Sequence, residues 1–242
     1  MRNFLAILVT LFCSALLHAE APLSPSNETS LPATFLDISS LDYTSVLQPP
    51  PAEGSYFSET DKTILHYSMD AATPDQISYA MSFIEDSVFD YSEVLGSTFN
   101  KGEYPTTAAI FEIITADVCR ANGIAKNYFK HPHPDTWRKM SDDDLDFDAG
   151  YSYPSAHASR AFVWAELLSQ LLPQYEDAFF KEAEKKSWSR VIIGRHYPSD
   201  VCAGKIYAHY LVQKFHENPD FQKAWNSLQQ EVSRNSSLVT AR

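Results

Sequence analysis

Residues 189–200 read Ser-Arg-Val-Ile-Ile-Gly-Arg-His-Tyr-Pro-Ser-Asp. The apolar residues of 177–193 recur at helical spacing, and a glycine follows the last of them. Pro198 suits the first position of a new helix, and a second helical pattern continues from it. We therefore predict two helices, 177–193 and 198–216, joined by a short turn that carries His196.

The same helical periodicity extends outward from this junction through most of the chain. Thr73, Pro74 and Gln76 form a helix start, with an N-cap, a proline at the first helical position and a capping-box partner. No alternating apolar pattern of useful length occurs, and the chain has only seven glycines, so strands are not indicated. The sequence predicts one all-α domain. Further helices are predicted over 73–91, 106–129, 155–172 and 219–232.

The N-terminal region has the organisation of an exported protein. A short positive start precedes an apolar run over 4–17, and small residues at Ala19 and Ala21 follow. A membrane anchor is the alternative, but that run is shorter than the roughly 20 residues needed to span a bilayer. We predict a signal peptide over 1–21, an extended arm rich in Pro and Ser over 22–60 and a helical domain over 61–242.

Charge and cysteine content narrow the classes of partner. The formal net charge of −12 and the pI near 5.0 argue against nucleic acid, because binding a polyanion calls for a basic surface. No later stretch is apolar enough for stable membrane insertion. Cys119 and Cys202 would remain after export and could form a disulfide, which the sequence leaves open. Neither CxxC nor HExxH spacing occurs, so no zinc site is predicted.

Three short segments carry residues suited to phosphoryl transfer, namely 126–134, 153–157 and 189–200. Such transfer requires donors for the non-bridging oxygens, an attacking group in line and a proton for the leaving oxygen. Ser155 opens a helix, whose first backbone N–H groups and dipole suit a phosphate. His157 would lie in the first turn of that helix, where it can donate a proton.

The segment 189–200 supplies the remaining parts of such a site. The planar guanidinium of Arg190 can hold a phosphate through two parallel hydrogen bonds. His196 and Asp200 are four residues apart, so the carboxylate can hold one imidazole nitrogen as N–H and leave the other to attack. Each of these residues alone is more often a cap or a solvated charge, but their combination favours a phosphatase.

The combination resembles the superfamily of acid phosphatases, lipid phosphate phosphatases and vanadium haloperoxidases. Its pattern is Lys-x6-Arg-Pro, then Pro-Ser-Gly-His, then Ser-Arg-x5-His-x3-Asp. The proline segment 47–51 and the C-terminal stretch 209–222 are also similar to those of bacterial class A non-specific acid phosphatases. The positions that match the motif are Lys126, Pro134, Pro154, Ser155, His157, Ser189, Arg190, His196 and Asp200.

The resemblance implies a role for each site residue. His196 would be the nucleophile that forms a phosphohistidine, and Asp200 would orient it. His157 would protonate the leaving alcohol and later activate water. No cofactor or metal is implied; the substrates would be small phosphate monoesters, and the location would be periplasmic. The phosphoryl oxygens would be held by Lys126, His133, Ser155, Arg190 and the backbone N–H of Ala156.

Two positions depart from the family's pattern. Ala156 stands where the family has glycine, and alanine keeps the backbone donor. His133 stands where the family has arginine. A histidine makes no bidentate contact and is cationic only below a pKa near 6.5 unless its surroundings shift it. We therefore expect activity to be confined more strongly to acid pH than in relatives that carry arginine, with Lys130 or His131 as alternative sources of the missing charge.

Several alternatives stay open at this point. A lipid phosphate phosphatase and a vanadium haloperoxidase share the motif, and a phosphate-binding relative with impaired catalysis would account for His133. A homo-oligomer is neither indicated nor excluded. The acidic cluster between the first two motifs lacks the glycine and the terminal glutamate of an EF-hand. We interpret this cluster as a solvated loop; its members are Asp142, Asp143, Asp144, Asp146 and Asp148.

Overall fold

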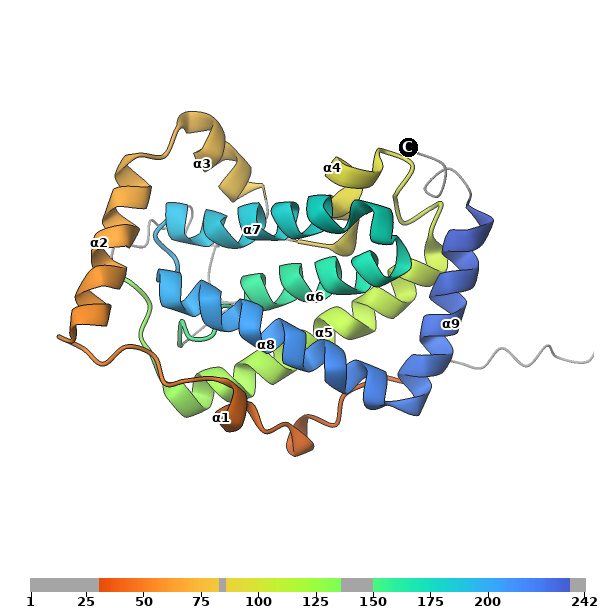
Figure 1. Cartoon of the computed structure of the whole chain (residues 1–242), viewed down its shortest axis with the longest axis horizontal. Helices are drawn as coiled ribbons and strands as arrows, with labels where there is room; N and C mark the ends of the chain where they lie inside the picture. The colour runs from red at the N-terminus through yellow and green to blue at the C-terminus, as the bar shows by residue number, and fades with distance from the viewer. Residues whose placement is uncertain (1–30, 83–85, 136–149, 236–242) are drawn as a thin grey trace, which may run out of the picture. The chain divides into compact units, whose positions relative to one another are not determined.

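The computed structural model describes residues 31–82, 86–135 and 150–235, and it is built there of helices joined by turns (Figure 1). These residues contain no strand, so the predicted all-α class is confirmed. None of their helices is long and apolar enough to span a membrane. The α-helices are α1 (Tyr43–Val46), α2 (Tyr56–Asp70), α3 (Pro74–Met81), α4 (Ser92–Leu95), α5 (Pro105–Phe129), α6 (Ala156–Leu171), α7 (Glu176–Ile192), α8 (Pro198–Glu217) and α9 (Pro219–Arg234).

Helix α6 is the centre of the packing in this unit. It contacts α5, α7, α8 and α9, and Figure 1 shows it between α7 and α8. Its buried residues lie on almost every side of the helix, which is typical of a helix surrounded by others. Small residues such as Ala161 and Ala165 alternate with large ones such as Trp164, whose indole N–H donates to Thr115. The helices α5 to α9 all begin and end within two residues of their predicted limits.

The N-terminus of α6 lies against the first turns of α8 because residue 204 has no side chain. A Cβ at Gly204 would stand 2.6 Å from the carbonyl oxygen of Ser155 and 2.8 Å from Cβ of Ala158. In the same contact the backbone N–H of Ser155 donates to the carbonyl oxygen of Asp200 at 3.0 Å. The two motif segments 153–157 and 189–200 are therefore brought together by close backbone packing.

The N-terminal part of the domain is more structured than the extended arm predicted over 22–60. Ser55 caps α2, which begins at Tyr56, and α1 precedes it. The buried carboxylate of Asp117 on α5 accepts the backbone N–H groups of Phe35 and Leu36 at 2.7 and 3.2 Å. Within the described residues 31–60 the segment therefore lies on the domain and includes helical turns, and single apolar residues such as Phe35 and Leu47 reach the core. The predicted signal peptide lies outside the described residues.

The predicted helix over 73–91 is also corrected by the structure. Its capping box is confirmed, since Thr73 accepts the N–H of Gln76 and Gln76 accepts that of Thr73. However, α3 ends at Met81, and Val88–Tyr91 forms a separate 3-10 turn with its own cap.

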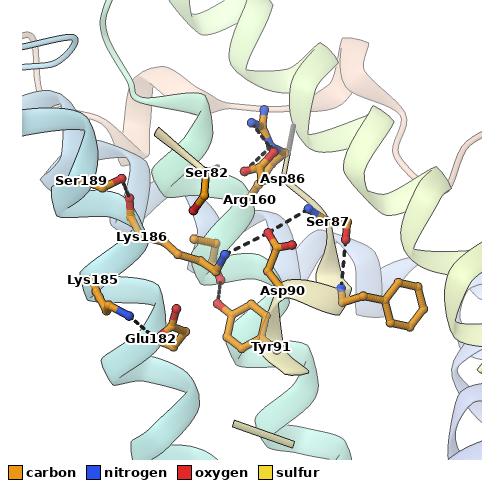
Figure 2. A network of polar contacts seen from close by, with 12 residues as sticks. Ser82, Asp86, Ser87, Asp90, Tyr91, Arg160, Glu182, Lys185, Lys186 and Ser189 are labelled. Carbon is orange, nitrogen blue, oxygen red and sulfur yellow. Dashed lines mark hydrogen bonds and ion pairs between the residues drawn. The ribbon is translucent and has the colours of Figure 1, made fainter. Parts of the chain in front are cut away.

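Two ion pairs attach the segment 86–91 to the helices behind it. Arg160 of α6 lies 2.7 Å from Asp86, and Lys186 of α7 lies 2.9 Å from Asp90, as Figure 2 shows. Ser87 donates its backbone N–H to the same Asp90 carboxylate. These partners are distant in sequence, so periodicity along the chain could not reveal them.

Candidate active site

His196 and Asp200 meet where the turn after α7 enters α8. Nδ1 of His196 lies 3.3 Å from Oδ2 of Asp200, and neither side chain is exposed to solvent. The backbone N–H of Tyr197 donates to the same oxygen at 2.9 Å. The same carboxylate oxygen therefore accepts a backbone N–H at the start of α8 and contacts the imidazole of His196. This arrangement agrees with the predicted spacing and leaves Nε2 as the nitrogen of His196 that could attack a substrate.

The second oxygen of Asp200 has two partners that the motif did not indicate. Nδ1 of His131 and Oγ of Ser152 each lie 3.3 Å from Oδ1, and they lie 3.0 Å from one another. Burial alone would raise the pKa of Asp200, but the hydrogen bonds from His131 and His196 and their charges outweigh it and lower that pKa to about 2. His131 therefore contacts the carboxylate that is predicted to orient His196. No signal in the sequence pointed to Ser152.

His133 lies next to His196, with 5.2 Å between the ring centroids. Its Nδ1 is 2.9 Å from the carbonyl oxygen of Arg195. Burial lowers the pKa of His133 to about 3, and the charges of His196, Arg195 and Lys126 act in the same direction. The surroundings of His133 thus shift its pKa well below the ordinary value near 6.5, and the sequence did not indicate how far the ring is desolvated.

A cleft of about 970 Å³ runs along α5 and the start of α6 and is bordered by the segment 86–89. Lys126, Ala156 and His157 line it together with Arg160. Lys126 is buried, and its Nζ donates to the carbonyl oxygen of Tyr151 at 2.6 Å. His157 is half-buried in the first turn of α6, as predicted. A predicted phosphate ligand and the predicted proton donor thus face one cleft, which Ala156 at the start of α6 also lines.

The other two predicted phosphate ligands are buried within the fold. Ser155 caps α6, where its Oγ accepts the N–H of Ala158 at 3.4 Å. The guanidinium of Arg190 donates to the carbonyl oxygen of Ala80 and to Oγ of Ser189, and burial lowers its pKa to about 10. The carbonyl oxygen of Arg190 also accepts the N–H of His196 at 3.2 Å. Arg190 therefore connects α3 to the turn that carries His196, the predicted nucleophile.

The suggested disulfide between Cys119 and Cys202 is not formed, and both thiols are free. Cys119 lines the cleft on α5, where Nη1 of Arg160 lies 3.4 Å from its sulfur. Cys202 lies on α8 near the charges of Asp61 and Glu184. The two cysteines thus face different neighbours, which spacing along the chain could not reveal. The acidic cluster over 142–148 lies outside the described residues.

Comparison with known proteins agrees with this geometry. Residues 105–217, which hold all the site residues above, match the model of the PAP2 superfamily. A non-specific acid phosphatase of Providencia stuartii is 37% identical over 83 residues, 34% of each chain, and one of Salmonella typhi is 26% identical over 164 residues, 65% of each chain. An acid phosphatase of Zymomonas mobilis is 25% identical over 200 residues, covering 78% of this chain and 74% of the relative.

The chain spans less than two thirds of the length of the first two of these relatives. The matches still extend beyond the motif residues, since the longest of them covers 78% of this chain. Together with the helical fold and the grouping of the motif residues, they show that the chain is similar to the PAP2 superfamily over residues 105–217 and to non-specific acid phosphatases.

Proposed function

We propose that the protein is an acid phosphatase that hydrolyses small phosphate monoesters through a phosphohistidine on His196. The observation that carries this proposal is the 3.3 Å contact between Nδ1 of His196 and Asp200. A carboxylate at Nδ1 favours the tautomer with its proton on that nitrogen and stabilises the positive charge that forms when Nε2 attacks. The acid phosphatases among its relatives support the same activity.

In the first step, Nε2 of His196 attacks the phosphorus while the bond to the leaving oxygen breaks. His157 gives that oxygen a proton, so an alcohol leaves. The charge on the non-bridging oxygens is offset by Lys126 and by the N–H groups at the start of α6, while Arg190, which donates to Ser189 and Ala80, contributes its positive charge from within the fold.

In the second step, His157, now neutral, takes a proton from a water molecule. The resulting hydroxide attacks the phosphorus, the P–N bond breaks, and phosphate leaves with His196 and His157 restored. Every charge that the reaction moves is accounted for by side chains, so the proposed reaction needs no metal ion. We also retain the proposal of export to the periplasm through the signal peptide over 1–21.

The first experiment measures hydrolysis of a chromogenic aryl phosphate from pH 4 to 8 with EDTA present. We expect turnover that resists EDTA and that is abolished in His196→Ala. His209→Ala is the matched control, because His209 is an exposed histidine on the outer side of α8. Turnover lost on EDTA treatment, or turnover retained in His196→Ala, would contradict the proposal.

The role of His157 is tested by varying the leaving group. A nitrophenolate leaves without a proton, whereas an alkoxide requires one. His157→Ala should therefore lose about 10²–10⁴-fold in kcat on an alkyl phosphate and much less in the first step with a nitrophenyl phosphate, measured as a burst of nitrophenol. Equal losses with both substrates would show that His157 does not protonate the leaving group.

A further inference from the structure

The hydrogen bond of His133 to the backbone determines which of its nitrogens can contact a ligand. Nδ1 lies 2.9 Å from the carbonyl oxygen of Arg195, and a carbonyl oxygen only accepts hydrogen bonds. Nδ1 must therefore carry a proton. In the neutral ring the lone pair is then on Nε2, which makes that nitrogen an acceptor.

Nε2 of His133 is buried, and it makes no hydrogen bond within the described part of the chain. Burying an acceptor without a hydrogen-bond donor costs free energy, and a ligand that donates a hydrogen bond would remove that cost. The ring stands beside His196, the proposed attacking group, at the position where the family has arginine. The substrate phosphate is the group that would approach both rings.

The charged groups around His133 disfavour a second proton on the ring. Arg195 and His196 face it from the turn before α8, and Lys126 faces it from α5. Asp200 is the negative group nearby, and it is already bonded to His131 and His196. Burial and the cations Arg195 and Lys126 thus suit an anion beside the ring better than another cation.

We propose, on the basis of the proposed function, that His133 makes the site selective for the monoanionic form of a phosphate ester. Nε2 accepts a hydrogen bond from the single P–OH group of that form. A dianion has no such proton and places an oxygen lone pair against the lone pair of Nε2. Arginine at this position has only donors and favours the dianion instead.

This selectivity predicts that binding weakens as the ligand loses its last proton. Phosphate esters lose that proton near pH 6. The pH at which binding weakens should therefore be a property of the ligand. If His133 were an ordinary acid with its own titration in this range, the pH would be the same for every ligand.

The experiment measures inhibition constants of methylphosphonate and of its mono-, di- and trifluorinated analogues from pH 4 to 8. Each fluorine lowers the second pKa of the phosphonate while its size changes little. We expect affinity to fall about tenfold per pH unit above the second pKa of each ligand, so that the four profiles are displaced along the pH axis. Four profiles that break at one common pH would overturn the proposal.

Variants at position 133 give a second, independent readout. In His133→Arg the tenfold loss per pH unit should disappear, because the dianion becomes the preferred ligand. His133→Phe keeps a flat ring but has no acceptor, so binding should be weak and the displacement between profiles should vanish. His209→Arg adds the same charge at an exposed position and should keep the wild-type profiles. A His133→Arg profile identical to wild type would also overturn the proposal.

The outcomes separate this inference from the proposed function. Displaced profiles without hydrolysis of any phosphate ester would support monoanion selectivity and contradict the phosphatase activity. Hydrolysis that depends on His196, together with profiles that coincide, would support the activity and contradict the role of His133.

Discussion

Nδ1 of His196 lies 3.3 Å from one oxygen of Asp200, and Nδ1 of His131 lies at the same distance from the other oxygen. The carboxylate is therefore shared between two imidazole rings and is fully buried. Asp200 keeps its negative charge despite burial because both imidazole rings can donate hydrogen bonds to the carboxylate. This shared carboxylate connects the proposed nucleophile to a histidine that precedes Asp200 by 69 residues in the chain.

The first prediction concerns the orientation of the nucleophile. In Asp200→Asn the amide can turn an N–H toward Nδ1 of His196, which reverses the tautomer and places the proton on Nε2. We expect kcat to fall about 10³–10⁴-fold, by analogy with the loss of the orienting carboxylate in hydrolases that use histidine. Steady-state kinetics give the loss, and circular dichroism checks that the helices persist. A loss of less than tenfold would mean that Asp200 does not set the tautomer.

The second prediction concerns His131 as a positioning residue. His131→Phe removes one of the hydrogen bonds that lower the pKa of Asp200, so that pKa should rise toward its ordinary value. The acid limb of the kcat profile should then move to higher pH, with a loss of up to about twofold at pH 4, a larger loss at pH 3 and almost none at pH 6.

His131→Gln provides the matched test, because its side-chain amide can still donate to Oδ1 of Asp200. We expect it to restore most of the acid limb. A purely structural role for His131 would lower kcat by the same factor at every pH and would leave the limb in place.

The third prediction concerns stability in acid. The pKa of Asp200 is about 2 in the folded protein, compared with an ordinary value of 3.8. A lowered pKa contributes stability above the unfolded value, and that contribution is lost as the pH falls through the folded value. It corresponds to about 2 kcal/mol. Urea unfolding from pH 2 to 6 should show wild type losing this advantage over Asp200→Asn between pH 4 and 2, and a constant difference would contradict it.

The fourth prediction concerns the contact between α6 and α8. Gly204→Ala places a Cβ 2.6 Å from the carbonyl oxygen of Ser155, which is backbone and cannot rotate away. We expect a loss of about 1–3 kcal/mol in the free energy of unfolding and a lower kcat, because the start of α6 must shift.

Gly123→Ala on α5 is the control for this prediction. A Cβ at Gly123 would meet nothing within 4 Å, and alanine is favoured over glycine inside a helix. This variant should be stabilised by about 0.5–1 kcal/mol. If both variants changed stability in the same direction, the close approach of α6 and α8 at residue 204 would not limit the fold.

Relations within a single turn of helix could be predicted from the sequence. His196 and Asp200 are four residues apart, and Pro198 begins a helix between them, so their contact follows from helix geometry. The limits of α5 to α9 likewise follow from apolar periodicity and from prolines at helix starts. These features depend only on residues close to each position in the chain, so the sequence alone determines them.

The hydrogen bonds and pKa values of the site residues depend on contacts between residues that are distant in the sequence. His131 reaches Asp200, and Nδ1 of His133 reaches the carbonyl oxygen of Arg195. Asp86 and Asp90, which were predicted to lie in one helix with α3, pair instead with α6 and α7. The pKa values of Asp200 and His133 follow from burial and from these partners. Desolvation and long-range hydrogen bonding depend on which helices pack together, and the spacing of residues in one segment carries no information about that packing.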